Sequence, residues 1–254
     1  MKTKEAMTLD RVLSRMGVTS RSSAKEAILA GRLKVNGRVV RDPECWVRPG
    51  RDFIQFDGNA VKRVRKIYLL FYKPKGVITS HGDPSGRKTV YDILKNGNNP
   101  TAPNEDFCWV APVGRLDKDT SGLLLMTNDT EFADFVTSPE SQVTKTYLVK
   151  TSGLLSDEII ARLEDGVEMK RGDQARPISV RRTEDRGKYT WLEIVLTEGK
   201  NREVRRMIEA VGFKVLKLVR TQIGSLTLEG LEVGKWRGLT SRELVAIRSS
   251  KGNA

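Results

Sequence analysis

The sequence has very little cysteine and histidine, the residues on which many catalytic and metal sites depend. Among 254 residues there are two cysteines and one histidine. Cys45 and Cys108 lie far apart and form no Cys-x-x-Cys motif, so the sequence predicts neither a disulfide framework nor a zinc site, and we expect two packed thiols. A single imidazole, His81 on a Gly- and Pro-rich turn, is a poor basis for a Ser-His-Asp relay or a His-ligated metal centre.

Cofactor and membrane signals are also missing. Neither a P-loop nor a Gly-x-Gly-x-x-Gly motif occurs, which argues against a nucleoside triphosphate or dinucleotide cofactor. No apolar run approaches the ~20 residues that a membrane-spanning helix needs, and the first residues lack the apolar core of a signal peptide. We therefore expect a cytoplasmic protein with no membrane partner, whose catalysis would rest on carboxylate, Tyr, Arg or Lys side chains.

Positive charge is abundant and unevenly distributed. The chain has 45 Lys and Arg against 32 Asp and Glu, a net charge of +13. Residues 1–66 hold 16 of these cations and 7 of the anions, so most of the excess lies in the first quarter of the chain. Such a balance favours polyanionic partners through phosphate contacts and counterion release, although it also suits an anionic membrane surface.

The first quarter has the pattern of a compact module. Leu9, Val12, Leu13 and Met16 follow helical spacing, and a second helix is predicted after Ser20, a suitable N-cap. After the second helix, apolar and polar residues alternate with a period of two, which is typical of β-strands. Strands at 33–35 and 38–40 flank Asn36-Gly37, the favoured two-residue hairpin turn, and residues 53–56 form a further strand.

This module resembles the S4 RNA-binding domain. The resemblance rests on residues 9–13, Ser20-Arg21 and residues 31–37, and it covers residues 8 to 56. It implies binding to structured RNA, mainly through shape and phosphate contacts. An ordinary solvated basic face is the alternative. The cations expected to contact RNA are Arg11, Arg21, Lys25, Arg32, Lys34 and Arg38.

The rest of the chain predicts an α+β domain. Residues 61–66 are basic, have no apolar face and are interpreted as a linker, so the predicted layout is a module at 8–60, a linker at 61–66 and a second domain at 67–250. Strands and helices alternate irregularly in that domain, which favours a mixed, mostly antiparallel sheet with flanking helices. The predicted strands are 67–72, 146–149, 189–196 and 214–219, and a helix over 157–163 is expected to be capped by Ser156.

A charged loop that leads into an apolar strand, residues 114–125, holds the main catalytic candidate. Asp117 precedes the turn Thr120-Ser121-Gly122, which is expected to carry residues 123–126 into the core. A carboxylate held in a fixed position at the edge of a sheet is a candidate catalytic residue. The alternative is a surface loop whose carboxylates cap backbone N–H groups, and Asp119 suits that local role.

The chain as a whole resembles the RsuA/RluA superfamily of RNA pseudouridine synthases, in particular the branch with an N-terminal S4 domain. Glu203 stands where many members have Gln, a change expected to be tolerated because Arg205 is retained. The motifs that carry the resemblance are Gly114-Arg115-Leu116-Asp117 with residues 120–124, Lys145-Thr146-Tyr147, residues 198–207 and residues 220–224.

The resemblance implies a cofactor-free reaction that breaks the N-glycosidic bond of a uridine and rejoins the base through C5. It implies that Asp117 is the nucleophile, that Tyr147 stacks on the flipped uridine and is a candidate for moving the C5 proton, and that Arg205 pairs with Asp117. Asn201 is expected to cap the helix that carries Arg205. Further arginines are expected to contact RNA phosphate: Arg115, Arg202 and Arg206.

The implied partner is ribosomal RNA or a pre-ribosomal particle, and the chain is expected to be a monomer. Residues 119–124 favour 23S over 16S ribosomal RNA, but the sequence does not identify the uridine. Two other classes stay open at this point. One is a non-catalytic RNA-binding or ribosome-assembly factor that kept the scaffold. The other is a basic DNA-binding protein, for which no recognition helix or dimerising heptad is evident.

Overall fold

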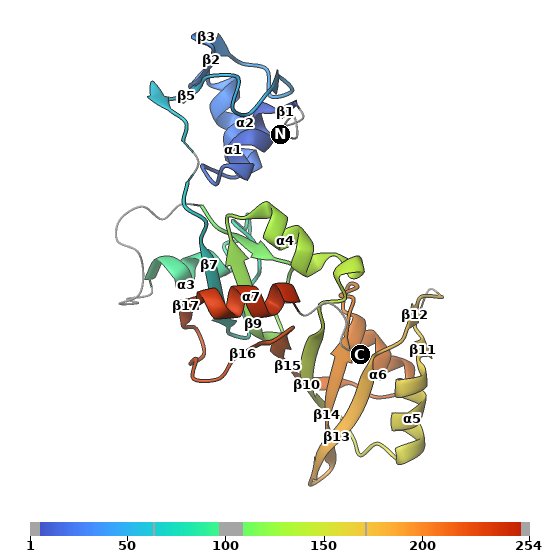
Figure 1. Ribbon diagram of the computed structural model, residues 1–254. Helices are drawn as coiled ribbons and strands as arrows, with labels where there is room; N and C mark the ends of the chain where they lie inside the picture. Colours follow the sequence, from blue (N-terminus) through green and yellow to red (C-terminus); the bar gives the residue numbers. More distant parts are fainter. Residues whose placement is uncertain (1–5, 63, 97–108, 171, 250–254) are drawn as a thin grey trace. The chain divides into compact units, whose positions relative to one another are not determined.

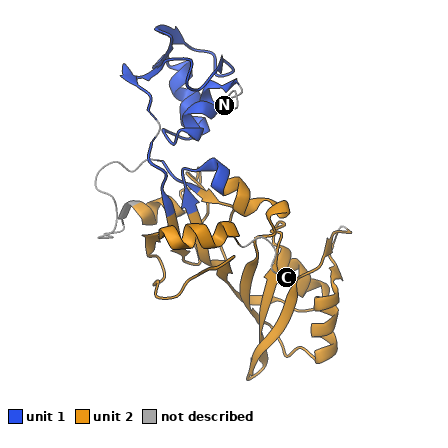
Figure 2. Cartoon of the chain, in the orientation of Figure 1, with its two compact units in different colours: residues 1–68, 103–111, 126–132 blue, residues 69–102, 112–125, 133–254 orange. Residues whose placement is uncertain are grey.

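The computed structural model describes residues 6–62, 64–96, 109–170 and 172–249 (Figure 1). Cys108 and the linker residue Arg63 lie outside the described residues. The chain divides into two compact units (Figure 2). Unit 1 comprises residues 1–68, 103–111 and 126–132, and unit 2 comprises residues 69–102, 112–125 and 133–254.

The N-terminal module of unit 1 has two short helices packed on a small sheet, as the periodicity predicted. Ser20 caps the second helix by accepting a hydrogen bond from Ser23 N at 3.0 Å. Asn36 and Gly37 both have positive φ, 50° and 81°, as the predicted hairpin turn requires. The helices are α1 (Leu9–Arg15) and α2 (Arg21–Leu29), the sheet has the order β3 (Arg38–Val40), β2 (Leu33–Val35), β5 (Ile54–Phe56), β6 (Asn59–Ala60), and β1 (Met7–Thr8) pairs with β4 (Trp46–Val47).

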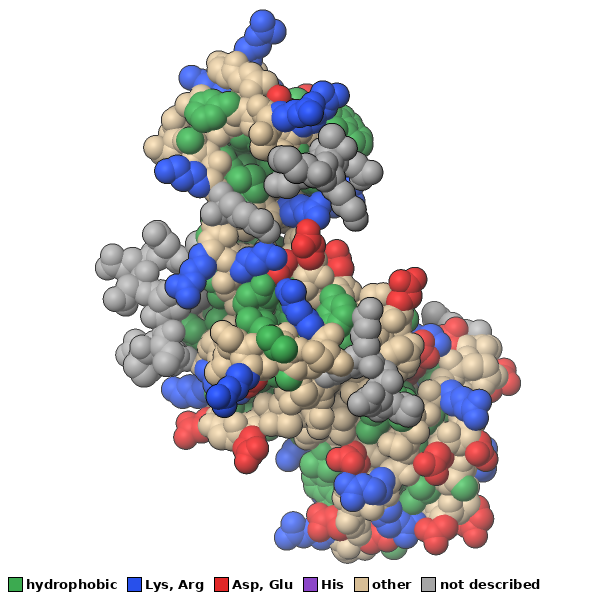
Figure 3. Space-filling view, in the orientation of Figure 1, with side chains coloured by type: hydrophobic (Ala, Val, Ile, Leu, Met, Phe, Trp, Pro, Cys, Tyr) green, Lys and Arg blue, Asp and Glu red, His purple; other side chains and the backbone are tan. Residues whose placement is uncertain are grey.

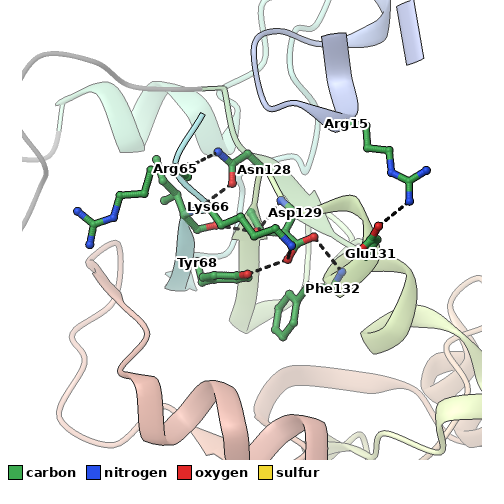
Figure 4. A network of polar contacts seen from close by, with 10 residues as sticks. Arg15, Arg65, Lys66, Tyr68, Asn128, Asp129, Glu131 and Phe132 are labelled. Carbon is green, nitrogen blue, oxygen red and sulfur yellow. Dashed lines mark hydrogen bonds and ion pairs between the residues drawn. The ribbon is translucent and has the colours of Figure 1, made fainter. Parts of the chain in front are cut away.

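The chain that follows this module is held by side chains of residues 127–132, also in unit 1 (Figure 4). Asn128 accepts a hydrogen bond from Ile67 N and donates one to Arg65 O, both at 2.8 Å, so its amide group acts like a strand partner. Asp129 accepts from Lys66 Nζ at 2.6 Å and from the Tyr68 hydroxyl at 2.7 Å. Residues 65–68 are therefore fixed by two adjacent side chains that are themselves buried.

A nine-stranded mixed sheet dominates the rest of the structure, and the expected α+β class is confirmed. The pairs β13–β14, β14–β10, β10–β15, β15–β16 and β7–β17 are antiparallel, and β15 runs parallel to β9. The main order is β13 (Ser179–Arg186), β14 (Tyr189–Leu196), β10 (Lys145–Thr151), β15 (Val215–Ile223), β9 (Ser121–Thr127), β7 (Tyr68–Lys73) and β17 (Trp236–Gly238); β16 (Leu226–Thr227) pairs with β15 and β8 (Ala111–Val113) with β9.

Helices and short elements complete the fold (Figure 1). Ser156 caps α5 (Asp157–Asp165) as predicted, accepting a hydrogen bond from Ile159 N at 3.4 Å. Within the described residues no helix is both long and apolar enough to cross a membrane. The remaining elements are α3 (Val90–Asn96), α4 (Thr130–Thr137), the 3-10 turn Pro139–Ser141, α5 (Asp157–Asp165), α6 (Glu203–Ala210), α7 (Ser241–Ser249), and the two-stranded sheet of β11 (Val167–Glu168) and β12 (Gln174–Ala175).

The strands bring one row of residues across the middle of the sheet. Tyr147 on β10 lies directly opposite Ile194 on β14 and Arg220 on β15, and Arg220 in turn lies opposite Gly122 on β9. Neighbouring strands are about 4.8 Å apart, so the backbones of Gly122 and Tyr147 are separated by roughly 10 Å. Segments distant in sequence thus meet where the charged loop enters β9.

Candidate active site

The loop before β9 has a fixed backbone on both sides of Asp117. Thr79 Oγ1 donates to Leu116 O at 2.8 Å, and Gly76 N donates to Lys118 O at 2.8 Å. Thr120 N closes a turn on Asp117 O at 3.1 Å. The Asp117 side chain nevertheless keeps 36% of its surface exposed. The loop therefore offers an accessible carboxylate on a backbone that cannot easily move.

Gly122 lets this loop come close to β15. Its φ of +120° disfavours any side chain, and a Cβ placed on it would lie 2.3 Å from Arg220 O and 2.5 Å from Arg220 N. Only glycine allows the two backbones to pair in parallel at this point. The expected entry of the apolar segment into the core is confirmed, since residues 123–126 are fully buried.

The cation that pairs with Asp117 is Arg202. Its guanidinium lies 3.6 Å from the Asp117 carboxylate, and both side chains are partly exposed. Arg202 is also the N-cap of α6, with a left-handed φ of 49°, so the prediction that Asn201 caps this helix is wrong. Because the chain turns sharply here, the Arg202 side chain is directed at the loop instead of along the helix.

Arg205 is buried and supports the loop backbone, which differs from the expected ion pair with Asp117. Its guanidinium donates to Asp119 O at 3.0 Å and to Val215 O at 3.3 Å, and it is 8% exposed. Burial and nearby Arg202 lower the pKa of Arg205, against the attraction of Asp117 and Asp119. Arg205 thus interacts electrostatically with Asp117, but its hydrogen bonds go to two backbone carbonyl groups, one in the Asp117 loop and one at the start of β15.

Lys73 is a site residue that the sequence reasoning missed. It ends β7, is fully buried, and donates from Nζ to Thr120 O at 2.8 Å and to Pro74 O at 3.1 Å. Burial lowers the pKa of Lys73 to about 8, although Asp117 and Asp119 oppose this shift. The sequence pattern could have revealed it, because Lys73 follows Leu69 and Phe71 at intervals of two residues in an apolar strand. A lysine on the same face as two buried side chains is expected to be buried as well.

Tyr147 lies in a strongly cationic surrounding. It is 9% exposed and shares its face of the sheet with Arg220, whose Nε donates to Leu123 O at 2.8 Å. Lys145, two residues earlier, donates to Thr197 O at 2.8 Å, and burial together with Arg220 lowers its pKa to about 8. A ring framed by buried cations suits an anionic ligand with an aromatic part.

Glu203, the departure from the family pattern, has a structural role at the start of α6. One carboxylate oxygen accepts from Lys200 N at 2.9 Å while Glu203 N donates to Lys200 O, which closes the turn that carries Arg202. Burial raises the pKa of Glu203. The second oxygen has no hydrogen-bond partner among the described residues.

The other arginines expected to contact phosphate differ in availability. Arg115, two residues before Asp117, is exposed. Arg206 pairs with Asp173 and donates to Lys170 O at 2.9 Å, so it is already engaged. No group of three or more His, Cys, Asp or Glu in the described ranges could hold a metal ion.

The N-terminal cations fall into two groups. Arg21 pairs with Asp10 at 2.9 Å, Lys25 with Glu44 at 3.6 Å, and Arg32 with Asp57 at 2.5 Å. On the face in view, the cations of this module lie at separate points (Figure 3). Three candidates are exposed and have no ion pair within the described part of the chain: Arg11, Lys34 and Arg38.

Comparisons with known proteins show which families the chain resembles. Residues 67–210 match the family described as RNA pseudouridylate synthase, and residues 7–52 match the S4 domain. The chain is 40% identical over 242 residues to ribosomal large subunit pseudouridine synthase B of Bacillus subtilis, with 95% of each chain covered. The protein of the same name from Yersinia pestis is 37% identical, with 91% of this chain and 72% of that one covered. A crystal structure of a pseudouridylate synthase is 28% identical with a TM-score of 0.65, covering 95% of this chain and 99% of the other.

Proposed function

Because the chain belongs to the RNA pseudouridylate synthase family, we propose that it isomerises a uridine of ribosomal RNA to pseudouridine, with Asp117 as the catalytic carboxylate and without a cofactor. The observation that carries this proposal is the accessible Asp117 carboxylate on a pinned loop, paired with Arg202 at 3.6 Å. Relatives named for the large ribosomal subunit favour 23S over 16S ribosomal RNA as the substrate. We place the enzyme in the cytoplasm as a monomer.

In the proposed reaction the C1′–N1 bond of the target uridine breaks, the base turns in the site, and a C1′–C5 bond forms. The proton on C5 then leaves and N1 ends with a proton, so the composition is unchanged. Asp117 either adds to the sugar or stabilises the positive charge that develops at C1′. Arg202 favours the charged carboxylate through an ion pair at 3.6 Å. Arg205 and Lys73 hold the loop backbone through hydrogen bonds to Asp119 O and Thr120 O.

Tyr147 is proposed to stack on the uridine after it has been turned out of its helix. Its ring lies one strand away from Arg220 and two from Gly122, at the end of the Asp117 loop. The hydroxyl is the candidate that accepts the C5 proton, which supplies general-base chemistry without histidine. Arg115 and Arg206 are proposed to contact the flanking phosphates, although Arg206 must then release Asp173.

We propose that residues 8–60 form an RNA-binding module, that residues 61–66 are a linker, and that residues 67–250 form the catalytic domain. The first candidates for phosphate contacts are the cations without an ion pair among the described residues: Arg11, Lys34 and Arg38. Arg21, Lys25 and Arg32 would exchange a carboxylate for a phosphate. Family membership argues against the DNA-binding and non-catalytic alternatives.

The proposal is tested by replacing Asp117 with Asn. Pseudouridine formed in 23S and 16S ribosomal RNA transcripts is measured by mass spectrometry after derivatisation. Asp117→Asn should lower the rate by about 10³-fold or more with RNA affinity unchanged, because the side chain keeps its shape and loses its charge. Asp119→Asn is the matched control, since Arg205 uses only the backbone carbonyl of this residue. Equal product from wild type and Asp117→Asn would refute the assignment.

A further inference from the structure

Three lysines and two aromatic rings gather on the sheet face opposite to Tyr147. On this face Lys150 of β10 lies directly between Trp191 of β14 and Lys217 of β15. Successive side chains of a strand point to opposite faces, and Lys150 is three residues from Tyr147, so the two side chains project from different sides. The group is called the lysine–aromatic surface and comprises Lys150, Lys188, Tyr189, Trp191 and Lys217.

The rings hold the ammonium groups in place. Lys150 Nζ lies 4.1 Å from the centre of the Tyr189 ring and 5.7 Å from that of Trp191. Lys217 Nζ lies 5.7 Å from the same Trp191 ring, and Lys188 Nζ 5.7 Å from the Tyr189 ring. Cation–π contacts of this kind favour a defined position of a long side chain over free motion in solvent. Two strands thus present their charges around one ring.

These charges lack compensation. None of the three lysines makes an ion pair in the described ranges of the chain, whereas Glu193 on the same face is paired with Arg181 at 3.0 Å. Lys150 and Lys217 are direct cross-strand neighbours, an arrangement in which like charges destabilise a sheet. An anion bound between them would remove this repulsion. The surface is therefore complementary to a ligand that carries negative charge.

A hollow of about 230 Å³ beside Trp191 adds a second feature. Its lining is Leu148, Thr183, Glu184 and Trp191, so it combines an aromatic edge and an apolar side chain with a carboxylate. Single-stranded nucleic acids are bound by aromatic side chains that stack on bases and by cations that follow the phosphates. Glu184 repels phosphate, so phosphates belong at Lys150 and Lys217, and the hollow suits a base.

We propose that the lysine–aromatic surface is a second contact site for the substrate RNA, which binds phosphates at Lys150 and Lys217 and an unpaired base beside Trp191. The inference rests on the proposed function, since that function supplies an RNA large enough to reach both faces of the sheet. The site is separate from the Asp117 loop, so it contributes to RNA affinity and not to the chemical step.

The test compares Lys150→Gln/Lys217→Gln with wild type in binding to a full-length 23S ribosomal RNA transcript over a salt series. Loss of two phosphate contacts should weaken affinity roughly tenfold at physiological salt. The slope of log affinity against log salt should fall by about 1.5. The rate at saturating RNA should stay the same. Lys150→Arg/Lys217→Arg should restore both affinity and slope.

The matched control is Lys235→Gln/Arg242→Gln, which removes the same charge from two exposed cations that make no ion pair in the described residues. An equal loss of affinity in this control would show a general charge effect and overturn the proposal. If wild type is active but Lys150→Gln/Lys217→Gln binds the RNA with unchanged affinity and salt slope, the proposal is also overturned. An acidic protein segment would then be the remaining candidate ligand of this surface. Absence of pseudouridine with wild type on either ribosomal RNA would instead refute the proposed function, and with it the substrate class of this surface.

Discussion

Replacing Gly122 with Ala should damage both stability and activity, because this glycine lets the loop of Asp117 lie against β15. The added Cβ would lie 2.3 Å from Arg220 O, where real contacts need more than 3.0 Å, so the backbones of β9 and β15 must separate by about 1 Å. The φ of +120° adds backbone strain of about 1–3 kcal/mol. Forced repacking of two buried strands costs a further ~1–3 kcal/mol.

Together these effects predict a loss of about 4 kcal/mol in the free energy of unfolding, or roughly 10 °C in melting temperature for a chain of this size. A shift of about 1 Å in the loop should also lower pseudouridine formation by about 10²-fold. Thermal denaturation and product yield are measured beside Gly82→Ala, where the new Cβ meets nothing within 4 Å and φ is ordinary. A Gly122→Ala variant that melts with wild type and stays fully active would refute the reasoning.

Two further predictions concern the buried and exposed cations. Burial lowers the pKa of Lys73 and of Lys145 to about 8, below the 10.5 of a free lysine, so between pH 8 and 10.5 the unfolded chain binds more protons and the free energy of unfolding should rise with pH. Lys73→Met should remove about half of this rise when the free energy of unfolding is measured by urea denaturation at several pH values. The same pH dependence in wild type and Lys73→Met would contradict the prediction. Lys34→Gln/Arg38→Gln should weaken binding to 23S ribosomal RNA and lower the salt slope by about 1.5, while the rate at saturating RNA stays constant. An unchanged slope would argue against an RNA contact at this hairpin.

Much of the fold follows from local patterns in the chain. Helical spacing at Leu9 to Met16 and the Asn36-Gly37 turn predicted α1 and the β2–β3 hairpin, because these structures depend on neighbours a few residues apart. The predicted strand 189–196 coincides with β14, whose buried and half-buried residues alternate along its whole length. The motif around Asp117 predicted this loop as the catalytic candidate for the same reason, since its turn and its apolar strand are adjacent in the sequence.

The partners of the candidate site are decided by tertiary structure alone. Asp117 meets Arg202 and Thr120 meets Lys73 across long stretches of chain, and no spacing rule specifies which of several arginines or lysines will arrive there. The left-handed turn at Arg202 sends that side chain to Asp117 and leaves Arg205 to bind Asp119 O. Sequence by itself therefore determined the elements, the family resemblance and the catalytic carboxylate as a hypothesis. Packing determined which cations surround it, because Lys73 reaches the loop from β7, and Arg202 and Arg205 reach it from α6.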